Sequence, residues 1–436
     1  MTATADLLAF AAAEHRLPEA VRADTLRLLT DTLAVGAAGA TAPGAEAILS
    51  VARAMGSGSE ARLLGSPNSS GECLPAPGAA FVNGYRIHCL EWDAVHEPAV
   101  VHAMSTVTAA LGAALDRRAR TSGPCDSEEA LAALAVGVDI ACGLGLSADS
   151  PLTFFRPAIA GLMGAAAAVA RIDHAPMSPA LGLAYSSLAG TMQAHVEGSP
   201  ALPFQIANAA RAAIVAADLA RAGFSAPYDI FEGPFGYFKL FDTGDLSRYT
   251  AALGQVWRIS EISTKPFPSG RASHAALSVL AELALDPASI ERIELFAPPL
   301  IQRLVGRTMP RTMEPAYARL CLPLLAALMV NDGMIDPRRF TEATFFDPAI
   351  ADLARRVLVT VDDNPDPNAL SPQRLVVTLT GGATIARDIP DTLGSPAAPL
   401  SPQQQSAKLS LARALAGEIA DPRLFDDPLA YFMEPR

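Results

Sequence analysis

The sequence predicts a mainly α protein, in which a large all-helical domain is followed by a smaller α+β unit. Residues 5–222 carry one apolar pattern of helical spacing after another, whereas strand patterns occur only beyond residue 260. The chain has 436 residues, which is more than one ordinary domain. We therefore expect an all-helical domain over residues 1–258 and an α+β domain over residues 259–395.

Several segments carry specific helix signals. Residues 18–36 have apolar side chains at helical spacing. The segment 127–143 opens with a possible N-cap serine followed by two glutamates, and Ser178-Pro179 marks another helix start. Residues 161–170 are small and apolar, as expected of a closely packed core helix. A further helix is predicted over residues 206–222, ended by a glycine.

The second part of the chain mixes strands and helices. Residues 290–296 and 357–361 are rich in β-branched or alternating apolar residues, and residues 375–389 predict a hairpin that turns at two glycines. Residues 315–329 predict a helix between these strands. The last predicted helix, residues 401–419, opens with capping-box spacing and is expected to pack back on the helical part.

Composition excludes several classes of protein. Half of the residues are hydrophobic and the net charge is −12, so disorder and a nucleic-acid partner are not expected. The N-terminus lacks a basic signal-peptide region, and the longest apolar uncharged run, residues 157–170, is too short to cross a bilayer. Five cysteines without a CxxC pair indicate a reducing compartment. We expect a cytoplasmic protein with no membrane partner.

Residues 81–116 concentrate titratable side chains in a chain otherwise rich in alanine and leucine. Pro98 interrupts this stretch and places one histidine at the head of the next helix, where backbone N–H groups favour anions. Histidine titrates near neutral pH, so we interpret the stretch as a proton-transfer site for an anionic substrate. The alternative is that each histidine is a satisfied polar group at a helix end. The concentrated residues are His88, Glu91, Asp93, His96, Glu97 and His102.

A second cluster lies at the predicted domain boundary, in residues 263–274. Lys265, Arg271 and His274 fall within ten residues of a loop stiffened by two prolines, together with Ser269. Cations on such a loop suit a carboxylate, and arginine can bind one in bidentate geometry. The alternative is a solvated basic loop.

Two other kinds of site are less compatible with the sequence. His88, Glu91, His96 and His102 are residue types that suit zinc, but Pro98 and the spacing argue against a closed ligand set. No GxGxxG follows a predicted strand, and no GxxxxGK[ST] is present. We therefore expect neither a metal nor a nucleotide cofactor.

Four motifs in order resemble the MmgE/PrpD family, which includes 2-methylcitrate dehydratases, cis-aconitate decarboxylases and iminodisuccinate epimerases. They are FVNGYRIHCLEWDAV at residues 81–95, EGSPALPFQIANAARAAIVAADLARAGFSAPYDIFEG at 197–233, KPFPSGRASH at 265–274 and AYARLCLPLLAALMVNDG at 316–333. Each motif alone is weakly specific, but the four in this order are a strong signal, and the resemblance covers nearly the whole chain. The resemblance implies that residues 396–436 complete the helical domain, that residues 259–395 form a lid, that the protein is a homodimer, and that it needs no cofactor.

The same resemblance identifies site residues that the chain keeps. His102 matches the family's histidine after its acidic run, Lys265 matches its loop lysine, and Glu91 stands where an aspartate is common. We expect His102 to exchange a proton next to a carboxylate, Lys265 to stabilise the resulting charge, and His88 and Glu91 to orient or relay.

The chain also departs from the family pattern. Arg156 replaces a second histidine, and three other polar positions are apolar here: Val95, Leu202 and Leu324. We expect Arg156 and Arg271 to anchor carboxylates, with Asp93, Ser269 and His274 completing the substrate-binding set. These residues predict a cofactor-independent lyase or isomerase for a small di- or tricarboxylate or a related acid. The alternative is an inactive family member that serves as a binding or scaffold protein.

Overall fold

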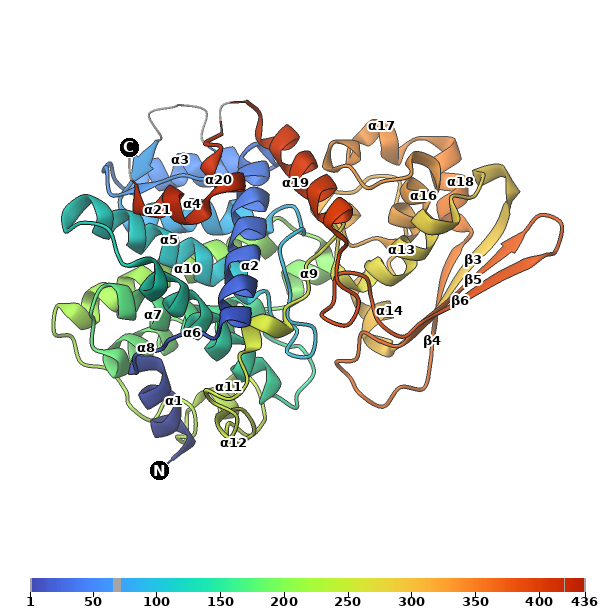
Figure 1. Cartoon of the computed structure of the whole chain (residues 1–436). Coiled ribbons are helices and arrows are strands. Elements are labelled where there is room, and N and C mark those ends of the chain that lie inside the picture. The colour runs from blue at the N-terminus through green and yellow to red at the C-terminus, as the bar shows by residue number, and fades with distance from the viewer. Residues whose placement is uncertain (1, 66–71, 419, 435–436) are drawn as a thin grey trace.

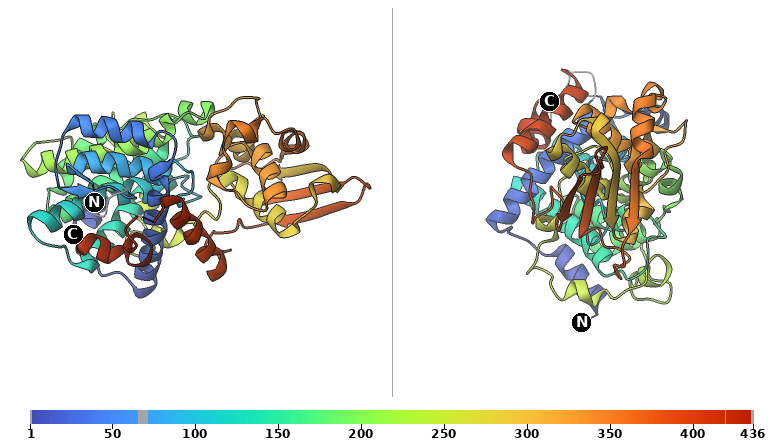
Figure 2. Two further views of the ribbon diagram at one scale, coloured as in Figure 1. Left: turned by 90° about the horizontal axis from the view of Figure 1, so that it is seen from above. Right: turned by 90° about the vertical axis from the view of Figure 1, so that its right-hand side faces the viewer.

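The computed structural model describes residues 2–65, 72–418 and 420–434. Figure 1 shows a large helical body joined to a smaller mixed unit, and Figure 2 shows the same two parts from above and from one side. The long helices of the body are α2 (Glu19–Ala38), α4 (Ala76–His88), α5 (Ala103–Thr121), α6 (Ser127–Leu146), α7 (Arg156–Ile172) and α10 (Ala201–Arg221). Shorter elements around them are α1 (Ala3–Ala12), α3 (Ala45–Met55), α8 (Met177–Tyr185), α9 (Gln193–Glu197), α11 (Tyr237–Leu240), α12 (Ser247–Thr250) and the antiparallel pair β1 (Ala61–Arg62) and β2 (Cys73–Leu74).

The centre of the body is built from small residues, as the sequence predicts for residues 161–170. A Cβ atom added to Gly164 of α7 would lie 2.1 Å from the carbonyl oxygen of Gly137 in α6. Only glycine therefore allows these two helices to approach so closely. By length and composition α6 could also cross a membrane, but 89% of its apolar window is buried inside the protein, as in a core helix.

The smaller unit contains a four-stranded sheet of order β4-β3-β5-β6, at the end of the molecule farthest from the helical body (Figure 1). β3 (Ile290–Ala297) pairs in parallel with β4 (Val357–Val361) and antiparallel with β5 (Gln373–Leu379), which pairs with β6 (Thr384–Ile389). Ile293 and Leu295 of β3 are buried opposite Val377 and Leu375. These residues alternate with more exposed ones, so the sheet buries one face. The helices of this unit are α13 (His274–Leu283), α14 (Pro299–Val305), α15 (Pro315–Ala318), α16 (Leu322–Asp332), α17 (Glu342–Phe345) and α18 (Pro348–Arg355).

The predicted strands and the hairpin are present, and the glycine turn is explained by Gly382, whose φ of +80° lies in the left-handed region. Several helix boundaries differ from the prediction. The N-cap of α6 is Asp126, one residue before the predicted serine, and its side chain accepts bonds from two backbone N–H groups. α10 begins at Ala201 and not at residue 206, because a proline is tolerated in the first turn of a helix. The predicted helix over residues 315–329 is two helices, α15 and α16.

The hydrophobic residues form two clusters. One extends from residue 7 to residue 262 and includes Ala412 and Ala416 of the late helix α19 (Pro402–Ala416). The other extends from residue 272 to residue 389. α19 therefore contributes to the core of the helical body, and the predicted capping box at Ser401 is present. Two short helices, α20 (Arg423–Asp426) and α21 (Pro428–Met433), follow it.

One buried ion pair attaches α19 to the body. Lys408 Nζ lies 2.6 Å from Asp31 Oδ1 of α2, and both side chains are at most 3% exposed. The same ammonium group donates a hydrogen bond of 3.2 Å to the backbone carbonyl of Trp92 and lies 5.5 Å from the centre of its ring. Trp92 belongs to the loop between α4 and α5, so the last long helix also holds that loop in place.

Replacing Lys408 by methionine leaves the Asp31 carboxylate buried without its cation. We expect Lys408→Met to lower the free energy of unfolding of the helical body by about 3–5 kcal/mol, measured by urea unfolding. Arg413→Met is the matched control, because it breaks the exposed pair with Asp426, whose side chains are 47% and 64% exposed. This control should cost about 0–1 kcal/mol. Equal losses in the two variants would contradict a structural role for the buried pair.

Candidate functional site

The loop between α4 and α5 has an unusual backbone. Glu91 and Val100 both have φ of +53°, a region that residues other than glycine rarely adopt. Each such residue costs about 1–3 kcal/mol and persists only where the surroundings hold it. Here Val95 and Ser263 exchange two backbone hydrogen bonds of 3.0 and 2.9 Å, which tie the loop to the segment leading into the smaller unit. Both strained residues line the same cavity.

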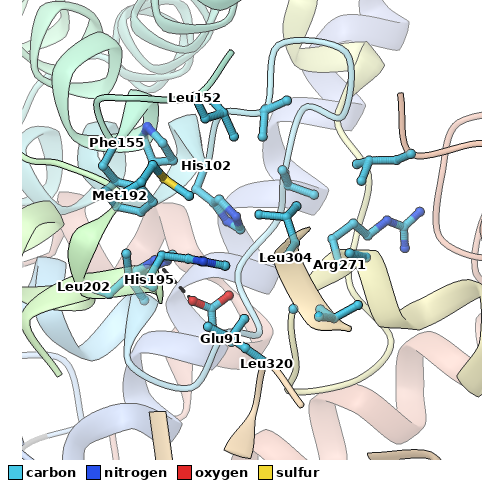
Figure 3. Close-up of a pocket in the computed structure, with 18 residues that line it drawn as sticks. Glu91, His102, Leu152, Phe155, Met192, His195, Leu202, Arg271, Leu304 and Leu320 are labelled. Carbon is cyan, nitrogen blue, oxygen red and sulfur yellow. Dashed lines mark ion pairs between the residues drawn. The ribbon is translucent and has the colours of Figure 1, made fainter. Parts of the chain in front are cut away.

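This cavity lies between the helical body and the smaller unit (Figure 3). It has a volume of about 610 Å³, including its open mouth. Its titratable lining residues are His88, Glu91, His102, His195 and Arg271. Its apolar lining includes Val95, Phe155, Met192, Leu202, Leu304 and Leu320.

A buried carboxylate organises the titratable wall. Asp93 is fully buried, and its Oδ2 lies 2.9 Å from Nδ1 of His88 and 2.9 Å from Nδ1 of His102. The hydroxyl of Ser105, in the first turn of α5, donates a hydrogen bond to the same oxygen. The break between α4, which ends at His88, and α5 makes this possible, because it places His102 at the N-cap of α5, facing the end of α4.

The pKa values of the two histidines that share Asp93 are shifted in opposite directions. Burial favours a neutral ring, but the carboxylates of Asp93 and Glu91 outweigh it at His88 and raise its pKa. At His102 burial prevails, helped by the charge of Lys265, and the pKa is lowered. The pKa of Asp93 is well below its usual value, because both histidines outweigh its burial. A neutral His102 that donates Nδ1–H to Asp93 keeps a lone pair on Nε2, and Figure 3 shows its ring reaching into the pocket.

Lys265 lies behind this wall rather than in it. Its Nζ is fully buried and lies 2.9 Å from the backbone carbonyl of Glu91, 3.2 Å from Oε2 of Glu91 and 4.0 Å from Oδ1 of Asp93. Burial would raise the pKa of Glu91, but Lys265, followed by the two histidines, lowers it to about 2. Lys265 does not line the cavity, and its ammonium group faces the carboxylates of Glu91 and Asp93.

The spacing of three residues would place His88 and Glu91 on one face of a helix, but α4 ends at His88. They still meet: Nε2 of His88 lies 3.6 Å from Oε1 of Glu91 across the turn. Nε2 of His88 is buried and has no hydrogen-bond partner among the described residues. Because Nδ1 of this ring faces Asp93, Nε2 can donate a hydrogen bond only when the ring carries both protons.

The two arginines expected to anchor carboxylates are already bound within the protein. Arg156 is 1% exposed, does not line the cavity, and pairs with Asp242 at 3.0 Å. Arg271 lines the cavity, but its guanidinium binds Glu97 at 2.7 Å and the backbone carbonyls of residues 392 and 393. Figure 3 shows this guanidinium directed away from the other labelled side chains. The structure thus places both guanidinium groups in internal ion pairs, and their binding to a substrate carboxylate stays a prediction.

Ser269 and His274 are also turned inward. Nε2 of His274 lies 3.1 Å from the hydroxyl of Ser269, both residues are fully buried, and neither lines the cavity. They hold the shape of the loop instead of facing a substrate. Burial keeps the pKa of His274 well below its usual value, with the nearby cations Arg271 and Lys265 adding to the effect.

His195 is a cavity residue that the sequence patterns do not single out. It lies on α9, and its Nδ1 accepts a hydrogen bond of 3.0 Å from Arg307 of the smaller unit. Burial, with the nearby charge of Arg307, lowers its pKa to about 4, so the ring is neutral with Nε2 as the donor. The loops that flank α10 are candidates for the rim of a pocket, but no spacing of residues in the sequence distinguishes His195.

The structure brings together a different set of possible metal ligands from the set that the sequence suggests. His96 binds Glu261 at 3.0 Å, away from the set proposed with it. The described residues place donor atoms of His88, Asp93 and His102 within 4.8 Å of one another. However, both imidazole nitrogens lie 2.9 Å from one carboxylate oxygen, closer than the about 3.3 Å between two ligands of a tetrahedral zinc ion. The three side chains bind one another in this geometry.

The positions that depart from the family pattern separate into two groups. Val95 and Leu202 line the cavity, so they bear on what can bind there. Leu324 is fully buried in the hydrophobic cluster of the smaller unit and does not line the cavity. Its side chain has a packing role.

Comparison with known proteins gives consistent matches along the chain. The family model for the MmgE/PrpD N-terminal domain matches residues 5–249, and that for the MmgE/PrpD C-terminal domain matches residues 267–421. The chain is 30% identical to the cis-aconitate decarboxylase of Homo sapiens over 380 residues, which cover 82% of this chain and 76% of the relative. It is 24% identical to the cis-aconitate decarboxylase of Aspergillus terreus, over 90% of this chain and 84% of the relative.

If Asp93 sets the charge of its two histidines, its neutralisation should appear in their titration. We expect Asp93→Asn to lower the pKa of His88 relative to the wild type, because Glu91 alone then opposes the effect of burial. NMR of the protein with ¹⁵N-labelled histidine rings measures this titration. Glu261→Gln is the control, since it removes the partner of His96 and should leave His88 unchanged. An unaltered His88 titration in Asp93→Asn would refute the assignment.

Proposed function

The chain belongs to the MmgE/PrpD family, and from this we propose that it is a cofactor-independent lyase or isomerase that removes a proton next to the carboxylate of a small acid. The observation that carries the proposal is the state of His102. Its Nδ1 is held by Asp93, its lowered pKa leaves it neutral, and its ring lines the cavity. A neutral imidazole with a fixed tautomer is suited to act as a general base.

Proton removal next to a carboxylate moves negative charge onto the carboxylate oxygens, so donors must be waiting there. Two cavity residues can supply them. His88 has a raised pKa and an unpartnered Nε2, and neutral His195 presents its own Nε2–H. Lys265 lowers the pKa of Glu91, and the carboxylates of Asp93 and Glu91 together raise the pKa of His88. His102 then exchanges the proton while the other groups fix the substrate and its developing charge.

The alternative proposal is a protein that binds a small acid without turning it over. It is favoured by the apolar residues Val95 and Leu202 in the cavity wall. The two proposals differ in one measurable property. A catalyst transfers solvent deuterium into a bound acid, whereas a binding protein retains the acid unchanged in D₂O.

We expect deuterium from D₂O to enter at least one member of a panel of small carboxylic acids, detected by mass spectrometry. His102→Gln should slow this exchange by about 10² to 10⁴, because the general base is lost. His174→Asn is the control: this histidine is exposed, and asparagine tolerates its φ of +52°. Exchange at the wild-type rate in His102→Gln would exclude the proposed base, and tight binding without exchange would favour the binding protein.

We also propose that the protein is a homodimer in which a second copy covers the outer face of α10. Phe204, Val215 and Leu219 are 43%, 42% and 38% exposed, and their spacing places them on one side of this helix. Met55 of α3 is 54% exposed and extends the same apolar surface, since its Sδ lies 3.9 Å from Arg211 of α10. An apolar surface of this kind marks an interaction site.

Placing a charge in that surface should separate the two copies. We expect Val215→Glu to shift the sedimentation coefficient from dimer to monomer, because the carboxylate would be buried in an apolar interface. Val361→Glu on the edge strand β4 is the matched control, because that valine is 46% exposed. This variant should still sediment as a dimer. A dimer lost only in Val361→Glu would assign the interface to the sheet edge.

A further inference from the structure

Apart from its histidines, Glu91 and Arg271, the cavity is lined by apolar residues and one glycine. Val95 of the strained loop, Leu202 of the first turn of α10 and Met192 before α9 approach from the helical body, and Leu304 and Leu320 come from the smaller unit. Figure 3 shows the labelled apolar side chains on several sides of the same space. A second charged group of a ligand would therefore face hydrocarbon.

The cations near the cavity are committed to internal partners. Arg271 is bound to Glu97 and two backbone carbonyls, and Lys265 to Glu91. Arg307 binds His195. Arg271 is the only lysine or arginine among the described residues that line the cavity, and its charge is already neutralised. A di- or tricarboxylate would thus leave at least one carboxylate without a cation.

Internal pairs also occupy the carboxylates behind the titratable wall. Oδ2 of Asp93 lies 2.9 Å from Nδ1 of His88, and Oε2 of Glu91 lies 3.2 Å from Nζ of Lys265. The cations of these pairs are therefore directed at carboxylates of the protein itself. Nε2 of His88 has no partner among the described residues, and the rings of His88 and His195 line the same cavity.

We propose that the substrate is a small monocarboxylate whose carbon chain is otherwise uncharged. This inference rests on the proposed function and narrows its substrate class. The carboxylate binds the donors of His88 and His195, and the carbon chain contacts Val95, Leu202 and Met192. His102 takes the proton from the carbon next to the carboxylate and, once its imidazolium has exchanged with solvent, returns a deuteron to the same carbon.

A matched pair of acids tests this directly. 3-Hydroxyhexanoate and 3-hydroxyadipate share six carbons and differ in whether the far end is a methyl group or a carboxylate. We expect deuterium from D₂O to enter carbon 2 of the monocarboxylate at least about tenfold faster, because the second carboxylate would be buried without a partner. Binding of both acids is measured in parallel by isothermal titration calorimetry with the wild-type protein.

Two variants supply the missing cation. Leu202→Lys should reduce the preference for the monocarboxylate or reverse it, whereas Leu202→Met should keep it. Leu202 is 3% exposed, so Met192→Lys, at a partly exposed position of the same wall, provides a second variant if the first does not fold. Unchanged preference in a folded lysine variant would overturn the assignment of this wall to the uncharged chain.

The outcomes separate the two proposals. Equal or faster exchange of 3-hydroxyadipate by the wild type would overturn the substrate class and leave the proposed proton transfer standing. Selective binding of 3-hydroxyhexanoate without exchange would overturn the proton transfer and leave the substrate class standing. Faster exchange of 3-hydroxyhexanoate that is lost in His102→Gln would support both.

Discussion

The site depends on one carboxylate removed from water. Asp93 is fully buried, and its Oδ2 accepts from His88, His102 and Ser105. A buried carboxylate is costly unless charged and polar neighbours compensate it. Because the compensating groups are two histidines, the contacts that stabilise the carboxylate also orient Nδ1 of His102 and raise the pKa of His88. Structure and proton chemistry thus share a single set of contacts.

Several distant segments are needed to keep this carboxylate in place. The loop that carries it contains two residues in the left-handed region, so it would relax if it were free. It is held by backbone bonds from Val95 to Ser263, by Lys265 from the segment before α13, and by Lys408 from the C-terminal helix. Segments far apart in the sequence therefore all contact this one loop. The domain junction is consequently part of the site and not a simple connection.

Much of this arrangement could be predicted from local sequence patterns. The helices and strands follow from apolar periodicity, and His88, Glu91, Asp93 and His102 come together because they flank one helix break. The partners of the cations could not be predicted this way. Arg156 and Asp242 are 86 residues apart, and Arg271 and Glu97 are 174 apart. Sequence reasoning recognised each arginine as a cation but had no means of knowing that a carboxylate far along the chain had neutralised it.

The apolar wall affects the chemistry as well as the choice of ligand. Burial is the largest influence on the pKa of His102, and it prevails there although Asp93 acts in the opposite direction. Val95 and Leu202 line the same cavity and exclude water from this ring. Polar side chains at these positions would admit water, weaken the desolvation and favour the imidazolium, which cannot accept a proton. The apolar wall therefore favours the neutral form of His102 that the proposed proton transfer requires, so the departures from the family pattern are compatible with that proposal.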